Sequence, residues 1–300
     1  MNIGSRLIKA IREKGKAMES EMSFFEHLEA LRWHLIRAAL AIILFTILAF
    51  SYYNWIFDDV IMAPTHSDFW TYRMMCGAGD FLQRVMPEFM HIKAKNFCVD
   101  KINVQLINTD MAGQFTLQIN SSLMIGLVLG IPYLFYELWK FVRPALHEKE
   151  RKAASGFVFY ASFLFMVGVL FGYFVITPLS IRFLSGYIVS TAIQNLFSID
   201  SYISSVATLT LATGVVFQMP ILVYILSSLG ILTPKFMRES RRYAIVIILI
   251  IAAIVTPTPD MLTMTVVAIP LLLLYELSIS VAGVVQRRRE KKSEELTIIN

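Results

Sequence analysis

The sequence predicts an all-α polytopic membrane protein: one domain, residues 1–300, with six transmembrane helices and both termini cytoplasmic. Composition supports this fold class, because 56% of the residues are hydrophobic and only 16% are charged, whereas soluble domains carry roughly 25% charged residues. Uncharged runs support it as well. Those between Lys152 and Arg182 and between Asp200 and Lys235 both exceed the roughly 20 residues that a membrane-spanning helix needs.

The six expected spans are the uncharged stretches, in chain order residues 35–54, 113–136, 154–178, 201–227, 243–257 and 262–283. We expect the fifth and sixth spans to be short. At about 1.5 Å per residue, the fifth covers roughly 22 Å, less than the roughly 30 Å hydrocarbon core. A thinned bilayer, shielding by neighbouring helices or water penetration from one side would each accommodate it, and the sequence leaves all three open.

Basic residues orient these spans. Of the 27 Lys and Arg, 21 fall on the side that carries an N-terminal arm (residues 1–34), two inner loops and a tail (284–300). Basic residues concentrate in cytoplasmic segments, so we place both termini in the cytoplasm and the long 55–112 loop outside. We therefore attribute the formal charge of +5 to the basic residues that orient the spans. No basic stripe indicates a nucleic-acid partner.

Motifs typical of enzymes do not occur in the sequence. It contains no GxxxxGK, HExxH or GxSxG and no Cys and His cluster at metal-binding spacing. We therefore expect no enzymatic activity, no cofactor and no metal site. The only two cysteines, Cys76 and Cys98, share the long outer loop, where a disulfide and two free thiols both remain open because sequence does not supply the geometry of a bridge.

Charged residues gather at the cytoplasmic ends of the first two spans, in FEHLEALRWHLIRAAL (Phe25–Leu40) and YELWKFVRPALHEKERK (Tyr136–Lys152). Pro144 in the second stretch is expected to break or start a helix. A solvated interfacial loop is the simplest interpretation. A docking surface is the other, since a plain span needs only a basic anchor at its end.

Four motifs resemble, in this order, the TatC family, the receptor and core subunit of the twin-arginine protein translocase: HLEALRW, FVRPALHEKER, GVVFQMP, and TPTPDMLTM followed by AIP and YE. The resemblance covers Phe24 to Glu276 and includes LINTDMAGQF before the second span. It implies a multi-pass protein of the bacterial inner (cytoplasmic) membrane, with residues 55–112 periplasmic, that binds twin-arginine signal peptides. It also implies export of folded proteins driven by the proton-motive force. Expected partners are folded cargo, small single-span TatA/TatB-type subunits, further copies of the chain and the lipid bilayer.

By this resemblance, Glu150 is the main contact for the paired arginines, and Phe141, Pro144 and Leu146 shape the loop around it. The chemistry suits this role, because a carboxylate accepts two parallel hydrogen bonds from a planar guanidinium. Lysine has no such fork.

The N-terminal motif departs from the family pattern HLxELR. Ala30 stands at the glutamate position, and His34 stands where a second basic residue is common. On a helix Glu26 lies one turn before Ala30 on the same face, whereas Glu29 points about 100° away. Both glutamates are candidates for the missing acid, and Arg32 would orient them or contact the membrane. Alternatively, they are solvated partners of nearby arginines.

Two further regions are singled out. Gln218 places an amide among apolar residues of the fourth span, where it must find a partner. In the family that the chain resembles, this position is often a glutamate and is linked to a polar cavity. Alternatively, Gln218 only forms a hydrogen bond to a neighbouring helix. We expect Pro220 to kink this helix. On the outer face, Pro64 is expected to be structural or functional, and Asp260 matches a family aspartate or caps the sixth helix.

A secondary transporter of a small solute is the alternative function. Such proteins show inverted repeats, broken helices and ion-binding acids near the midplane. The sequence has no convincing repeat and no carboxylate near the middle of an expected span, so we favour the translocase.

Overall fold

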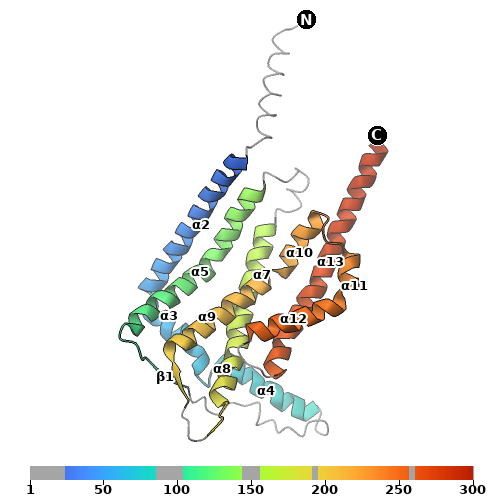
Figure 1. Ribbon diagram of the computed structural model, residues 1–300. Coiled ribbons are helices and arrows are strands. Elements are labelled where there is room, and N and C mark those ends of the chain that lie inside the picture. Colours follow the sequence, from blue (N-terminus) through green and yellow to red (C-terminus); the bar gives the residue numbers. More distant parts are fainter. Residues whose placement is uncertain (1–23, 86–103, 144–155, 191–194, 257–260, 300) are drawn as a thin grey trace.

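The computed structural model describes residues 24–85, 104–143, 156–190, 195–256 and 261–299, and within them it is a bundle of helices (Figure 1). The helices that correspond to the expected spans, in chain order, are α2 (Phe24–Ser51), α5 (Gly113–Val142), α7 (Phe157–Phe171), α9 (Ile199–Val216), α10 (Met219–Ser228), α12 (Arg241–Val255) and α13 (Met261–Ile299). The start of α2 and the end of α13 lie at the same end of the bundle, the upper end in Figure 1. The prediction of a mainly helical membrane protein is confirmed.

Helices α2 and α5 lie side by side along much of their length (Figure 1). Glycines on α5 make this contact close. A Cβ atom at Gly126 would lie 2.8 Å from the Cα of Thr46, and one at Gly130 would lie 3.2 Å from the Cα of Ile42. A side chain at either position would collide with the backbone of α2. The glycines, which have none, therefore let the two helices approach closely.

The third and fourth expected spans are both interrupted. A π-helical turn, η5 (Gly172–Ile176), joins α7 to α8 (Thr177–Gly186). Between α9 and α10, Phe217 and Gln218 stand outside both helices, and Pro220 follows in the first turn of α10. Proline lacks the N–H that a continuous helix would use, so an interruption at this point is expected from the sequence.

Among the described residues, five helical segments are long and apolar enough to cross a membrane: Leu28–Ser51, Gly113–Val142, Phe157–Gly186, Ile199–Ser228 and Thr263–Glu290. The fifth expected span corresponds to α12, which has 15 residues and is inclined to the long helices in Figure 1. Helix α12 is short, as expected, and is not one of these five segments. A count of six spans therefore stays a prediction. The expectation of a short sixth span is wrong, because the candidate membrane-spanning segment of α13, Thr263–Glu290, has 28 residues.

Several boundaries also differ from those expected. The N-terminal arm is helical from Phe24 onward, α5 continues to Val142 beyond the expected end at 136, and α13 runs through the charged tail to Ile299. The expected ends were placed at the first charged residues. A helix that leaves the bilayer or pairs its charges continues past that point.

The outer segment 55–112 contains regular structure where a loop was expected. Its elements are α3 (Tyr53–Ile56), η1 (Phe57–Ile61), η2 (Ala63–Thr65), α4 (Trp70–Val85) and β1 (Gln105–Ile107). Strand β1 pairs in parallel with β2 (Leu196–Ser198), a two-stranded sheet that the all-α prediction missed. Strands of three residues show too few alternations to be recognised from sequence.

Three tyrosine hydroxyls tie the outer segment to the bundle. They belong to Tyr72 on α4, Tyr173 on η5 and Tyr202 on α9, and we call them the tyrosine cluster. Their backbone acceptors are the carbonyls of Pro64 and Pro178 for Tyr72 (2.9 and 3.1 Å), Val60 for Tyr173 and Ile61 for Tyr202. Each hydroxyl satisfies a carbonyl of the turn that follows the first span, which fixes that turn against two later helices.

Helix α12 is held to the bundle by a buried apolar cluster shared with α9 and α13. Its members include Leu209, Phe217, Ile248, Ala252, Val267 and Leu271. The short α12 is therefore packed against longer neighbours on one side. Shielding by neighbouring helices is one of the three ways in which a short span was expected to fit the bilayer.

Candidate functional site

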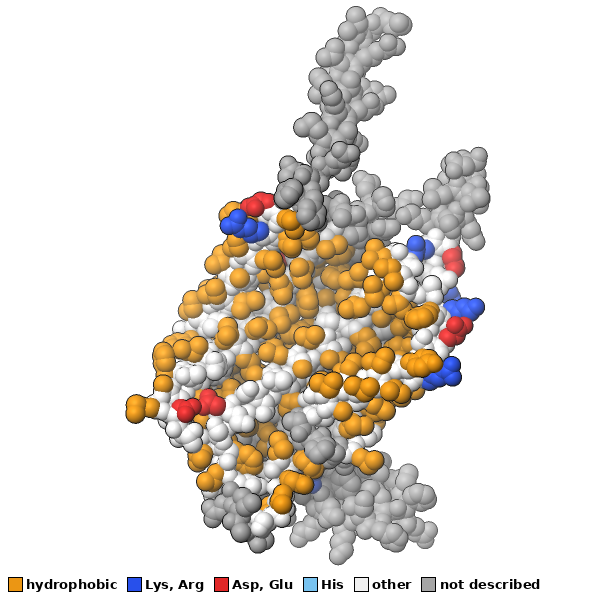
Figure 2. Space-filling model, viewed as in Figure 1, with side chains coloured by type: hydrophobic (Ala, Val, Ile, Leu, Met, Phe, Trp, Pro, Cys, Tyr) orange, Lys and Arg blue, Asp and Glu red, His pale blue; other side chains and the backbone are white. Residues whose placement is uncertain are grey.

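Figure 2 shows hydrophobic side chains over most of the described part of the face in view, with acidic and basic side chains at the upper end of α2 and along the right-hand edge, and an acidic group at the lower left. Large apolar side chains of α2, such as Leu40, Ile43 and Ile47, are more than half exposed. A membrane protein presents such a surface to lipid, and its charges mark the ends of the spans.

The upper end of α2 carries an exposed ion pair. Glu29 Oε1 lies 3.7 Å from Arg32 Nη1, and the two side chains are 56% and 68% exposed. Pairs of this kind in contact with solvent contribute little to stability. The Glu29 carboxylate is therefore exposed to solvent beside Arg32, and the roles of both residues stay predictions.

Ala30 and His34 lie one turn apart on α2, and both are partly buried. The His34 Nδ1 atom is 2.5 Å from Glu137 Oε2 on α5. The ring of Phe141, one turn further along α5, meets the imidazole edge-on at 6.0 Å between centroids. The structure thus brings the expected site residue Phe141 together with the N-terminal motif.

Glu137 was not among the expected site residues, although it lies at the centre of this contact. Only 2% of the residue is exposed. The Tyr133 hydroxyl donates to its Oε1 at 2.8 Å, and Arg37 Nη1 lies 3.6 Å from its Oε2. The sequence placed Glu137 just beyond the second span. The spacing of Tyr133, Glu137 and Phe141, one helical turn each, is the signal that points to a common face of α5.

Other expected residues fall outside what the structure describes. Glu150, Pro144 and Leu146, which follow α5, and Asp260, before α13, are in the undescribed ranges. Glu26 lies on the first turn of α2, but its side chain is not described. Their roles stay predictions.

Gln218 lies at the break between α9 and α10. Its side-chain amide nitrogen donates to the carbonyl of Ala161 on α7 at 3.2 Å, whereas its Oε1 is buried without a partner among the described residues. This is the helix-to-helix hydrogen bond that the sequence allowed.

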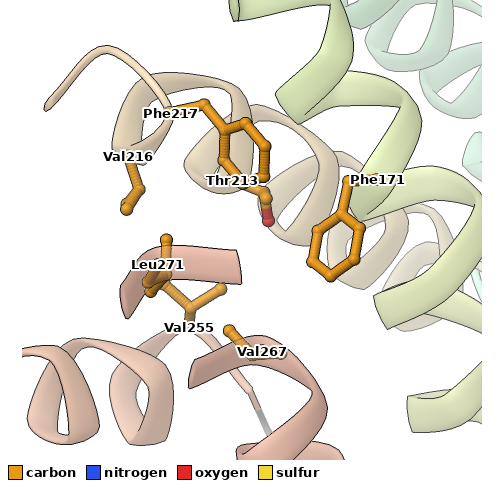
Figure 3. Close-up of a pocket in the computed structure, with 7 residues that line it drawn as sticks. All are labelled: Phe171, Thr213, Val216, Phe217, Val255, Val267 and Leu271. Carbon is orange, nitrogen blue, oxygen red and sulfur yellow. The ribbon is translucent and has the colours of Figure 1, made fainter. Parts of the chain in front are cut away.

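A small pocket lies beside this break, between α7, α9 and the pair α12 and α13 (Figure 3). Its lining is Phe171, Thr213, Val216, Phe217, Val255, Val267 and Leu271, and its space is about 10 Å³, close to the minimum for one water molecule. Gln218 is not part of the lining, and Thr213 supplies its only polar side chain. This pocket is therefore not the polar cavity that the family resemblance implies.

On the outer face, Pro64 is buried in η2 and its carbonyl accepts from Tyr72, and its role stays a prediction. Cys76 on α4 is disulfide-bonded, while Cys98, the other cysteine of the sequence, lies outside the described ranges. Within the described residues, no three His, Cys, Asp or Glu side chains form a group that could hold a metal ion.

Comparisons with known proteins agree with the geometry. Residues 26–270 match the family model TatC, described as "Sec-independent protein translocase protein (TatC)". A TatC protein of Blattabacterium sp. subsp. Periplaneta americana is 35% identical over 274 residues, which cover 91% of this chain and 100% of the relative. A TatC protein of Deinococcus radiodurans is 33% identical over 260 residues, covering 87% and 85%.

Two solved structures are also similar. A crystal structure of the twin-arginine translocase receptor TatC is 31% identical with a TM-score of 0.59, and covers 87% of this chain and 100% of that one. A second, in DDM, is 32% identical with a TM-score of 0.62, covering 86% and 99%.

Proposed function

The chain belongs to the TatC family of Sec-independent protein translocase proteins, and on that premise we propose that it binds twin-arginine signal peptides and forms the core of a translocase that exports folded proteins. As a member of this family it is a multi-pass inner-membrane protein and a translocase subunit, not an enzyme.

The observation that carries the proposal is the exposed acid on α2. Glu29 is 56% exposed, and the arginine that it pairs with, Arg32, is 68% exposed. It stands at the end of α2 that lies beside the end of α5 (Figure 1), and the chain continues from α5 toward Glu150. Carboxylates from both segments suit a pair of guanidinium groups, each of which offers two parallel N–H donors.

Topology follows from the same placement. We place both termini, the start of α2 and the charged end of α13 in the cytoplasm, with the short α12 as the fifth of six crossings. Residues 287–289, all arginine, are exposed near the upper end of the bundle, as cytoplasmic anchors are. The tyrosine cluster and Cys76 then face the periplasm.

The proposal includes partners and an energy source. Small single-span subunits of the TatA/TatB type and further copies of the chain complete the translocase. The proton-motive force drives export, and each charge that crosses 100 mV contributes about 2.3 kcal/mol. The sequence has no nucleotide-binding motif to supply energy in another way.

Export in cells tests this function. A bacterial strain without its own TatC would receive this chain together with small single-span subunits of the TatA/TatB type, and a fluorescent protein that folds before export would carry a twin-arginine signal. We expect periplasmic fluorescence that is lost with a Lys-Lys signal and on addition of a protonophore. Equal export of both signals, or export that survives the protonophore, would contradict the proposal. A small-solute transporter would give no export at all.

A further inference from the structure

Glu137 is a buried carboxylate near the upper end of a membrane-spanning helix. Burying a charge without partners is costly, and Glu137, 2% exposed, has three partners. Among the described residues, the charged or titratable side chains that face it are His34 and Arg37 from α2 and Tyr133 from α5. Two of the three come from the other helix, so the carboxylate joins α2 to α5.

The position of this contact along α2 is informative. Closer to the outer face, α2 is held by close packing on Gly126 and Gly130. His34 lies about two turns nearer the upper end than Ile42. Among the described residues, the contact of His34 Nδ1 with Glu137 Oε2, at 2.5 Å, is the polar link between α2 and α5 that lies nearest to the turn carrying Glu29 and Arg32.

We propose that Glu137 is a positioning residue of the signal-peptide site: it holds the cytoplasmic end of α2 against α5 and so fixes where the acids of α2 stand. The inference rests on the proposed function. Glu137 is too buried to meet a ligand, so it acts through His34.

Peptide binding gives the first test. Affinities of a fluorescent Arg-Arg signal peptide and its Lys-Lys counterpart would be measured on the purified full chain in detergent, for the parent, Glu137→Ala, His34→Ala and the double variant. We expect each single variant to weaken Arg-Arg binding about fivefold or more and Lys-Lys binding less than about twofold. Because both substitutions remove the same contact, between His34 and Glu137, the double variant should bind the peptides with the affinities of the single variants.

Glu276→Ala is the matched control. Glu276 also pairs with an arginine, Arg241 at 2.8 Å, but it is about half exposed and lies on α13. The Glu276→Ala variant should bind both peptides with the parent's affinities. If Glu137→Ala keeps the parent's preference, or weakens both peptides equally, Glu137 does not position the site.

A distance measurement tests the inference without any peptide. Spin labels would be attached at Leu28→Cys and Val142→Cys, which are exposed positions on α2 and α5, with serine in place of the native cysteines. We expect the distance distribution to broaden in Glu137→Ala and to remain narrow in Glu276→Ala. An unchanged distribution would overturn the positioning role even if peptide binding is specific. Conversely, a parent that does not distinguish the peptides would refute the proposed function while this measurement still decides the role of Glu137.

Discussion

Gly126 on α5 lies directly against the backbone of Thr46 on α2: a Cβ at this glycine would be 2.7 Å from the Thr46 nitrogen and 2.8 Å from its Cα. A backbone cannot rotate away as a side chain can, so α2 would have to move. Overpacking of this kind costs about 1–3 kcal/mol. We expect Gly126→Ala to lower the free energy of unfolding by that amount, measured by denaturant titration in detergent.

Gly283 offers the control for this substitution. It is also helical, and nothing lies within 4 Å of a Cβ built there. Gly283→Ala should be neutral or slightly stabilising, since alanine is the better helix former. Equal effects of the two substitutions would contradict the close α2 to α5 contact.

Tyr72→Phe should destabilise the outer face. The substitution removes one hydroxyl and leaves the carbonyls of Pro64 and Pro178 without their donor, which costs about 1–3 kcal/mol. Denaturant titration checks the loss, and Tyr52→Phe, at an exposed position, is the matched control. A loss no greater than the control's would mean that the tyrosine cluster does not hold the turn.

The buried phenol of Tyr72 also predicts that the stability of the fold depends on pH. Burial raises the pKa of the Tyr72 phenol, and nearby Arg182 offsets this in part. Above the ordinary value of about 10, the unfolded chain loses the proton while the folded chain keeps it. Stability should therefore fall as pH rises above about 10, and Tyr72→Phe should show a shallower fall.

Gln218→Leu should have little effect on stability. It removes the hydrogen bond to the Ala161 carbonyl, and such bonds between membrane helices contribute about 0.6 kcal/mol on average. It also removes the unpartnered Oε1, which offsets part of that loss. We expect a change below about 1 kcal/mol in the same titration. A loss above about 2 kcal/mol would show that the amide has a larger structural role.

Glu26→Gln and Glu29→Gln distinguish the two candidates for the acid missing at Ala30. Ala30 is partly buried and lies on the face of α2 that includes His34, and Glu26 is one turn before it, whereas Glu29 is paired with Arg32. Because the Glu29 carboxylate is exposed, we expect the Glu29 variant to weaken Arg-Arg peptide binding more, by about threefold or greater. A larger effect at Glu26 would assign the role to the acid one turn before Ala30.

The spans were predictable because the property that defines them is local. An uncharged run such as the one between Lys152 and Arg182 identifies a membrane helix without any knowledge of its neighbours. The ends of helices were less predictable. Charges end a run in the sequence, but α13 continues through its arginines because a helix can leave the bilayer as a helix.

Glu137 shows why part of the site could not be predicted. Whether a glutamate at the edge of a span is solvated or buried depends on what faces it, and its partners His34 and Arg37 lie about 100 residues earlier in the chain. The parallel pairing of β1 with β2 has the same cause, since their partners are distant in sequence. By contrast, the exposed Glu29 and Arg32 were recognised because a motif within one helix contains both.

Binding of a twin-arginine signal peptide to the purified chain tests the central claim most directly. A fluorescent Arg-Arg peptide and its Lys-Lys version would be titrated against the parent and Glu150→Gln in detergent. The account predicts a preference for Arg-Arg of about tenfold, roughly 1.4 kcal/mol, that collapses in the variant. Equal binding of both peptides, with no effect of the substitution, would contradict the claim that this chain reads paired arginines with its cytoplasmic acids.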